Sequence, residues 1–125
     1  MALIFLSLYE GELIMTINEY QKNALRTANE SLSPFQQLQN GIMGLNGEAG
    51  ECIDILKKHM FQGHELDEEH IAKELGDIAW YLALSAYAIG YDLESIMRMN
   101  VDKLRARYPD GFDIEHSLHR AKNDI

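Results

Sequence analysis

Two pairs of acidic residues have a spacing that suits metal chemistry. Glu48 and Glu51 are three residues apart, and Glu74 and Asp77 repeat that spacing after a gap of 22 residues. If both segments are helical, the two side chains of each pair lie on one helix face. Apolar residues follow the first pair and flank the second. Packed helix axes approach to about 8–10 Å, so the four carboxylates can converge if the two helices are antiparallel neighbours.

A convergence of four carboxylates in apolar surroundings needs a compensating cation. Without one, the buried negative charges would cost much free energy. An all-oxygen ligand set suits Mg²⁺ or Mn²⁺ rather than zinc. Di-iron carboxylate bundles use Glu-x-x-His on two helices, and no glutamate of this chain has histidine three residues later. The alternative is that both acidic pairs lie on solvated helix faces, where such spacings are common.

The histidines are predicted to be surface residues in loops or near helix ends. The His-x-x-His spacing near the C-terminus could bind a metal adventitiously, but the sequence offers no third ligand for it. The five residues are His59, His64, His70, His116 and His119.

Capping signals predict the helices that position the acidic pairs. Thr16-x-x-Glu19 is a capping box that opens a first helix, extending to about residue 28. Ser33, Pro34 and Gln36 supply an N-cap, an N1 proline and an N3 glutamine. The second helix is expected over residues 34–59, with a kink possible near Asn40-Gly41, and it carries the first acidic pair.

Two further helices are predicted from similar start and stop signals. A third begins near Glu68 and ends at Gly90, a natural C′ residue. Asp92 caps a fourth, which ends before Pro109. No stretch alternates apolar and polar residues for long enough to be a strand. The expected fold is all-α, a bundle of four main helices.

Glycines recur every third residue before and within the first acidic pair, at 41, 44, 47 and 50. Each weakens a helix by about 1 kcal/mol relative to alanine. A stripe without side chains would let a second helix or a ligand approach the backbone. The plainer alternative is that Gly41 and Gly44 mark a loop, and that only Gly47 and Gly50 pack tightly.

The third helix contains a run without formal charge, from Ile78 to Tyr91. A surface helix normally keeps a polar face, so this one is expected to be buried on several sides. A 125-residue chain has few elements for that purpose, which favours a homodimer or homotetramer packed through this helix. The alternative is a central helix within a single chain.

Composition narrows the class of protein. The 125 residues suffice for one domain, and the net charge of −9 argues against a general nucleic-acid surface. The one cysteine, Cys52, permits no intrachain disulfide and fits the cytoplasm. The apolar start, ALIFLSLY, is too short to span a membrane and has no basic residue before it. Residues 1–14 are either an extension ahead of a true start at Met15 or a segment packed on the surface.

These features resemble the MazG-like all-α nucleoside triphosphate pyrophosphatases. The resemblance lies in the acidic spacing, in GEAGE at 47–51, in KELGD at 73–77 and in NVDKLRARYP at 100–109. It covers roughly residues 30–112. Phosphoribosyl-ATP pyrophosphatases and dimeric dUTPases share this architecture. The domain is accordingly expected over residues 15–112, with residues 113–125 as a C-terminal tail.

The resemblance implies hydrolysis of a nucleoside triphosphate to the monophosphate and pyrophosphate with Mg²⁺. It also implies that family members form dimers or dimers of dimers. Glu48, Glu51, Glu74 and Asp77 would be the metal ligands, and one of them would orient or deprotonate the attacking water. Phosphates carry negative charge, so cationic and polar side chains should hold them. The candidates are Lys57, Lys58, Asn100, Lys103, Arg107 and Tyr108, with a solvated surface as the alternative for the two adjacent lysines.

The base of the nucleotide is not readable from the sequence. Trp80 and Tyr81, one turn past Asp77, could stack on a base or could belong to the core, and Phe35 and Gln39 could line a pocket. Two rival functions stay open. One is a metal-dependent nucleotide sensor that binds without turnover, and the other is a structural helical dimer with solvated acidic pairs.

Overall fold

The computed structural model describes residues 14–125. The choice between an extension ahead of Met15 and a packed segment concerns residues 1–13, which lie outside the described range. Within the described range the fold is all-α and has no strands. Its elements are α1 (Ile17–Leu25), α2 (Pro34–Phe61), α3 (Glu68–Ala88), α4 (Leu93–Arg107) and α5 (Ile114–Leu118). None of the helices between residues 14 and 125 has the length and apolarity needed to cross a membrane.

The predicted helix boundaries are largely confirmed. Both capping boxes form, at Thr16 with Glu19 and at Ser33 with Gln36. Gly90 has a φ of 81° after the end of α3, a left-handed conformation that glycine adopts without strain. Helix α1 is shorter than predicted. Helix α2 is unbroken through Asn40-Gly41, and it extends two residues past His59, to Phe61.

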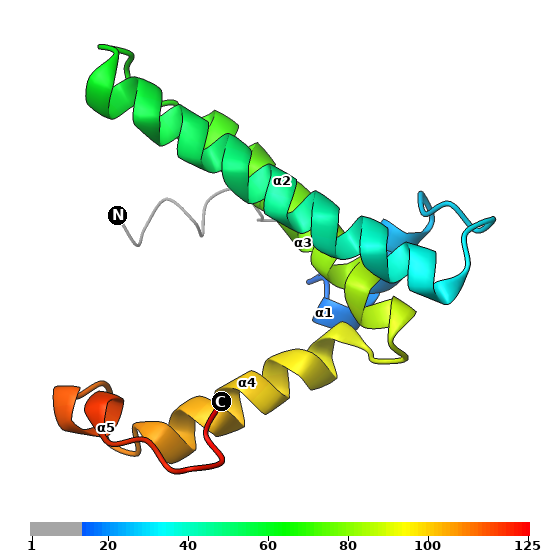
Figure 1. Cartoon of the computed structure of the whole chain (residues 1–125). Helices are drawn as coiled ribbons and strands as arrows, with labels where there is room; N and C mark the ends of the chain where they lie inside the picture. Colours follow the sequence, from blue (N-terminus) through cyan, green and yellow to red (C-terminus); the bar gives the residue numbers. More distant parts are fainter. Residues whose placement is uncertain (1–13) are drawn as a thin grey trace.

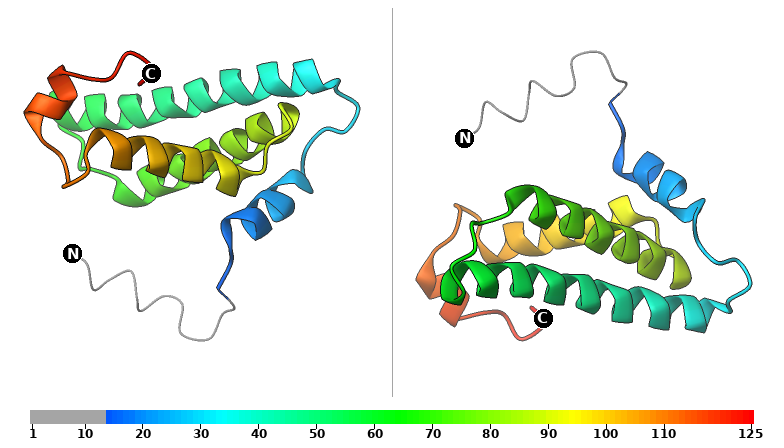
Figure 2. Two further views of the ribbon diagram at one scale, coloured as in Figure 1. Left: turned by 90° about the horizontal axis from the view of Figure 1, so that it is seen from below. Right: turned by 90° about the horizontal axis from the view of Figure 1, so that it is seen from above.

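Helices α2 and α3 run side by side and form a long hairpin (Figure 2). Two of the four stripe glycines make this close pairing possible. A Cβ on Gly41 would lie 2.2 Å from the Ser85 Oγ, and one on Gly44 would lie 2.2 Å from the Tyr81 ring. A Cβ on Gly47 or Gly50 would meet no heavy atom of the described chain within 4 Å. The close-approach prediction therefore holds for the first two glycines, and the alternative that they mark a loop is wrong.

Helix α1 is held against the turn between α3 and α4 by one buried amide. The Gln21 Nε2 donates to the Ala83 carbonyl at 3.2 Å, and its Oε1 accepts from the Leu93 N–H at 2.9 Å. Around it lies the small buried core of the chain, with Ala83, Ala86 and Leu93 at its centre. The uncharged run of α3 supplies two of these three residues.

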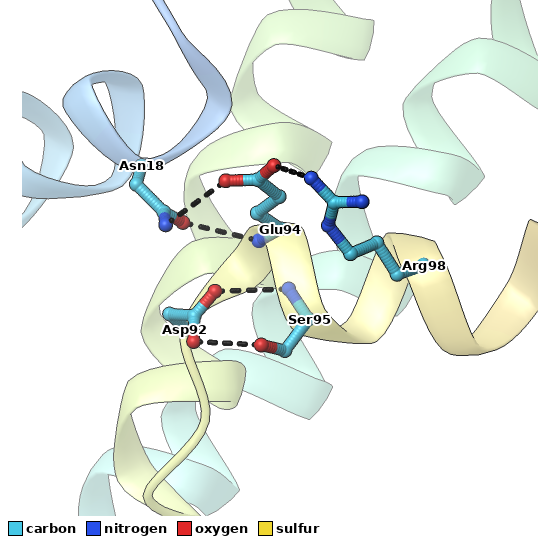
Figure 3. Close-up of polar contacts among 5 residues, drawn as sticks. All are labelled: Asn18, Asp92, Glu94, Ser95 and Arg98. Atoms are coloured by element: carbon cyan, nitrogen blue, oxygen red, sulfur yellow. Dashed lines mark hydrogen bonds and ion pairs between the residues drawn. The ribbon is translucent and has the colours of Figure 1, made fainter.

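The direction of α4 is set at its first turn (Figure 3). The Glu94 N–H donates to the Asn18 Oδ1 at 3.1 Å, and the Asn18 Nδ2 donates back to the Glu94 carboxylate at 3.3 Å. Asp92 caps the helix by accepting from the Ser95 N–H and hydroxyl. From this anchored turn α4 runs away from the α2–α3 hairpin (Figure 1). One chain therefore does not enclose a four-helix bundle by itself.

The segment after α4 is more ordered than a loosely docked tail. It forms the short helix α5, capped by Asp113, and then turns back along α4 (Figure 1). The Asp124 carboxylate receives two hydrogen bonds from the Arg107 guanidinium. Sequence periodicity could not reveal this docking, because a five-residue helix carries too little pattern and the ion pair spans 17 positions.

Candidate metal centre and nucleotide site

Three of the predicted metal ligands meet where α2 and α3 pack. Carboxylate oxygens of Glu48, Glu74 and Asp77 all lie within 4.8 Å of one another. Glu48 comes from α2, and the other two come from successive turns of α3. The side chain of Glu74 is only 14% exposed, and Asp77 is open to solvent. The geometry is that of a half-open cluster at the surface of the hairpin.

The negative charges in this cluster act on one another. The pKa of Glu48 is raised above its ordinary value, first by a hydrogen bond with the Glu74 carboxyl. Burial and the nearby charges of Glu74, Asp77 and Glu51 raise it further. Close carboxylates favour the protonated form of Glu48 when no cation is bound, and a bound cation would relieve this repulsion.

The spacing of the cluster fits a hard divalent cation. Oxygen ligands lie about 2.0–2.6 Å from Mg²⁺ or Ca²⁺, so oxygens on opposite sides of such an ion are about 4–5 Å apart. The three carboxylates already meet that limit without any movement of the backbone. Mg²⁺ usually keeps several waters, and the exposed side of Asp77 leaves room for them.

Glu51, the fourth predicted ligand, is exposed and lies outside the three-carboxylate group. It is one turn from Glu48 on α2, near enough for its charge to contribute to the raised pKa of Glu48. The i,i+3 spacing placed it on the correct side of the helix. Spacing alone could not show that its side chain stays out of the cluster.

His70 is a neighbour of the cluster that sequence reasoning missed. Its Nε2 lies 2.9 Å from the Glu74 Oε1, across one turn of α3. The imidazole therefore contacts one oxygen of a carboxylate that belongs to the cluster. The i,i+4 spacing from His70 to Glu74 was a readable signal, but the residue was assigned to the surface because it lies near the start of the predicted helix. Half of the side chain is exposed in the structure.

The two lysines after the first acidic pair are engaged with a carboxylate of their own helix. Asp54 lies 3.0 Å from the Lys57 Nζ and 2.6 Å from the Lys58 Nζ. These hydrogen bonds hold the pKa of Asp54 below its ordinary value and raise the pKa of Lys58. Both ammonium groups remain about half exposed, so a competing phosphate can still reach them.

The cations on α4 are held by the C-terminal segment. The Lys103 Nζ donates to the main-chain oxygen of Ile125 at 3.0 Å. The Arg107 Nε and Nη2 donate to the two carboxylate oxygens of Asp124 at 2.7 and 2.5 Å. The Arg107 guanidinium also lies 5.8 Å from the centre of the Tyr108 ring, and Asn100 is exposed further up α4. These residues stand away from the hairpin that carries the acidic cluster (Figure 1).

The candidate base-contacting residues occupy different settings. The Trp80 Nε1 donates to the Ala24 carbonyl and the Thr27 hydroxyl, both at 2.9 Å, so the indole ties α3 to the end of α1. Tyr81 packs edge-on against Trp80 and covers Gly44. Phe35 and Gln39 are exposed at the start of α2. Of these four, the two on α2 have the freer side chains.

Comparison with known protein families identifies the domain. The model of the MazG nucleotide pyrophosphohydrolase domain matches residues 36–112, more than half of the chain. The chain belongs to the MazG family. The match contains both acidic pairs, the hairpin that brings them together and the whole of α4, so the family resemblance noted in the sequence is confirmed.

Among known proteins, this MazG chain is similar to the Gene 37 protein of Mycobacterium phage L5. The two are 33% identical over 73 residues, which cover 55% of this chain and 64% of the phage protein. The match thus spans less than two thirds of that relative's own length. No solved structure matches the chain significantly.

Proposed function

We propose that this chain hydrolyses a nucleoside triphosphate to the nucleoside monophosphate and pyrophosphate, with Mg²⁺ or Mn²⁺ as the cofactor. The observation that supports this most is the meeting of Glu48, Glu74 and Asp77 within a MazG domain. Glu51 completes the ligand set by a change of side-chain rotamer. A soluble nucleotide substrate and a single cysteine suit action in the cytoplasm.

The chemistry required of the chain is hydrolysis at the α-phosphorus. The oxygen of a water molecule bonds to this phosphorus, and the bond to the oxygen that bridges to the β-phosphorus breaks. Pyrophosphate leaves with the bonding electrons, and the water's proton passes to a carboxylate of the acidic cluster, which orients the attack. The metal, when bound, neutralises phosphate charge and stabilises the developing charge on the leaving group.

The α4 cations of one chain stand away from the acidic cluster of the same chain (Figure 1). Lys57 and Lys58 are on the same helix as the cluster, whereas Lys103 and Arg107 stand on the diverging α4 (Figure 1). We therefore include a homodimer, or a homotetramer of two dimers, in the proposal. A second copy would cover the apolar faces of the hairpin and bring its own α4 cations toward the phosphates.

The test is a screen of ribo- and deoxyribonucleoside triphosphates with Mg²⁺, in which pyrophosphate and phosphate are detected separately. Pyrophosphate release that stops on chelation of the metal is the expected result. Binding without pyrophosphate release would identify the metal-dependent sensor instead. If no triphosphate binds and none releases pyrophosphate, the structural helical dimer remains as the function.

A further inference from the structure

The positive charge of this acidic protein is concentrated at one end. Residues 98–125 hold six of the eleven Lys and Arg residues but only five of the twenty Asp and Glu residues, for a net charge of +1. Residues 1–97 hold the remainder and carry a net charge of −10. The part of the molecule that repels an anionic ligand least is therefore residues 98–125, which include most of α4, α5 and the segment after α5.

A pocket of about 410 Å³ lies within this positive end. Its volume is within the range of small-molecule sites. Cationic and imidazole side chains dominate its lining, and only one carboxylate contributes. The charged and titratable lining residues are Lys103, Arg107, His116, His119, Arg120 and Asp124.

The one carboxylate in the pocket lining, Asp124, is hydrogen-bonded to Arg107, the side chain best suited to bind an anion. Asp124 takes both hydrogen bonds that the Arg107 fork offers, and the two side chains are only 13% and 10% exposed. Lys103, one turn earlier on the same face of α4, donates to the main-chain oxygen of Ile125. Oxygens of the last two residues thus lie on two neighbouring cations of one helix face, in the way that neighbouring phosphate groups would bind.

The family resemblance already implies that Lys103 and Arg107 hold phosphates. We propose that Asp124 is an internal competitor in this pocket, which the incoming phosphates must displace from Arg107. The identity of the ligand, the triphosphate or the pyrophosphate product, rests on the proposed function. While Asp124 is hydrogen-bonded to Arg107, a phosphate group cannot bind to this guanidinium. The apparent affinity for phosphate is therefore the intrinsic affinity multiplied by the fraction of molecules in which Asp124 has left Arg107. The segment after α5, which contains Asp124, thus lowers the affinity for the substrate or for the pyrophosphate product.

The test measures binding of inorganic pyrophosphate by calorimetry with EDTA present, so that no metal at the acidic cluster contributes. Asp124→Asn should bind pyrophosphate about tenfold more tightly than the wild type. Asp110→Asn, an exposed position in the turn after α4, makes the same change in net charge and should leave the affinity near the wild-type value. Equal affinities of Asp124→Asn and Asp110→Asn would overturn the proposal.

A double-mutant cycle tests whether the competition runs through Arg107. In an Arg107→Gln background, the gain from Asp124→Asn should vanish, because both then lack the shared partner. A gain that persists in that background would also overturn the proposal. If Asp124→Asn alters folding, the wild type still decides: bound pyrophosphate should shift the ¹³C resonance of the Asp124 carboxyl, and binding without that shift contradicts displacement.

None of these measurements depends on turnover. If the protein releases pyrophosphate from a triphosphate but Asp124→Asn and Asp110→Asn bind pyrophosphate equally, the proposed function stands and the competitor role of Asp124 is wrong. If the protein has no turnover but Asp124→Asn still gains affinity for pyrophosphate through Arg107, the competitor role of Asp124 stands and the proposed enzymatic function is wrong.

Discussion

Glu48 gives the acidic cluster a signature in the pH dependence of stability. Its pKa is raised above the ordinary 4.5, so the folded metal-free protein holds this proton more tightly than the unfolded chain. The free energy of unfolding should therefore be larger near pH 4.5 and fall as the pH rises through the raised value. Carboxyls with lowered pKa, such as Asp54 and Asp92, lose their stabilisation only at lower pH.

Urea titrations of the EDTA-treated protein between pH 4.5 and 8 measure this slope. Glu48→Gln should flatten it, because the carboxyl group with the raised pKa is gone. Glu65→Gln, in the exposed loop between α2 and α3, is the matched control and should keep it. Parallel curves for all three proteins would show that the carboxyls of the cluster do not interact in the folded state.

Asp77 allows metal binding to be separated from folding. Asp77→Asn removes a ligand but also relieves repulsion, so the metal-free protein should melt at an equal or higher temperature. The same change should abolish pyrophosphate release and most of the stabilisation by added Mg²⁺, which is about 2.7 kcal/mol at a hundredfold excess over Kd. Thermal shift and turnover assays check this. Normal turnover with an unchanged Mg²⁺ response would contradict the metal site.

Residue-level prediction from the sequence succeeded where chemistry depends on local spacing. Two i,i+3 pairs were enough to bring Glu48, Glu74 and Asp77 together. Spacing does not specify rotamers, which is why the exposed position of Glu51 was not foreseen. It also says nothing of partners distant in sequence, so the ion pair of Arg107 with Asp124 was invisible.

At the scale of the element, the α2–α3 hairpin depends on two glycines and not on the other two. Gly41→Ala should lower the free energy of unfolding by about 1–3 kcal/mol, because its Cβ would meet the Ser85 Oγ at 2.2 Å and the Ser85 main-chain nitrogen at 3.1 Å. The serine hydroxyl can rotate away, but the backbone cannot. Gly47→Ala should instead raise stability by up to about 1 kcal/mol, because helix propensity improves without a clash.

Urea denaturation of the two variants, compared with the wild type, measures both signs. If Gly41→Ala were neutral, the packing distance between α2 and α3 would have to be larger than in this structure. A loss of stability in Gly47→Ala would show that something covers this face of α2 in solution, and the second subunit would be the first candidate.

Helix starts and stops were predictable because caps are local. The boxes at Thr16 and Ser33 and the glycine at 90 act within one turn, so the sequence contains the whole signal. The departure of α4 from the hairpin is set by contacts between residues 76 positions apart, such as Asn18 with Glu94. Such contacts leave no trace in helical periodicity.

At the scale of the whole molecule, apolar surface points to assembly. Few hydrophobic side chains between residues 14 and 125 are fully buried, while Met43 and Ile53 of α2 are 71% and 66% exposed. Exposed apolar surface on this scale marks an interaction site in a soluble protein. We expect light scattering at micromolar concentration to give a multiple of 14.3 kDa.

A substitution at one of these exposed apolar positions of α2 separates assembly from folding. Met43→Glu places a charge where a monomer would tolerate it, since the side chain already faces solvent, but where a dimer interface would not. The variant should shift the measured mass toward 14.3 kDa, and its pyrophosphate release should fall if the second copy supplies the α4 cations. Asn23→Glu, an equal charge change at an exposed position of α1, should alter neither. A wild-type monomer mass, or an unchanged oligomer in Met43→Glu, would remove this face from the interface and require one chain to bring its own α4 to the acidic cluster.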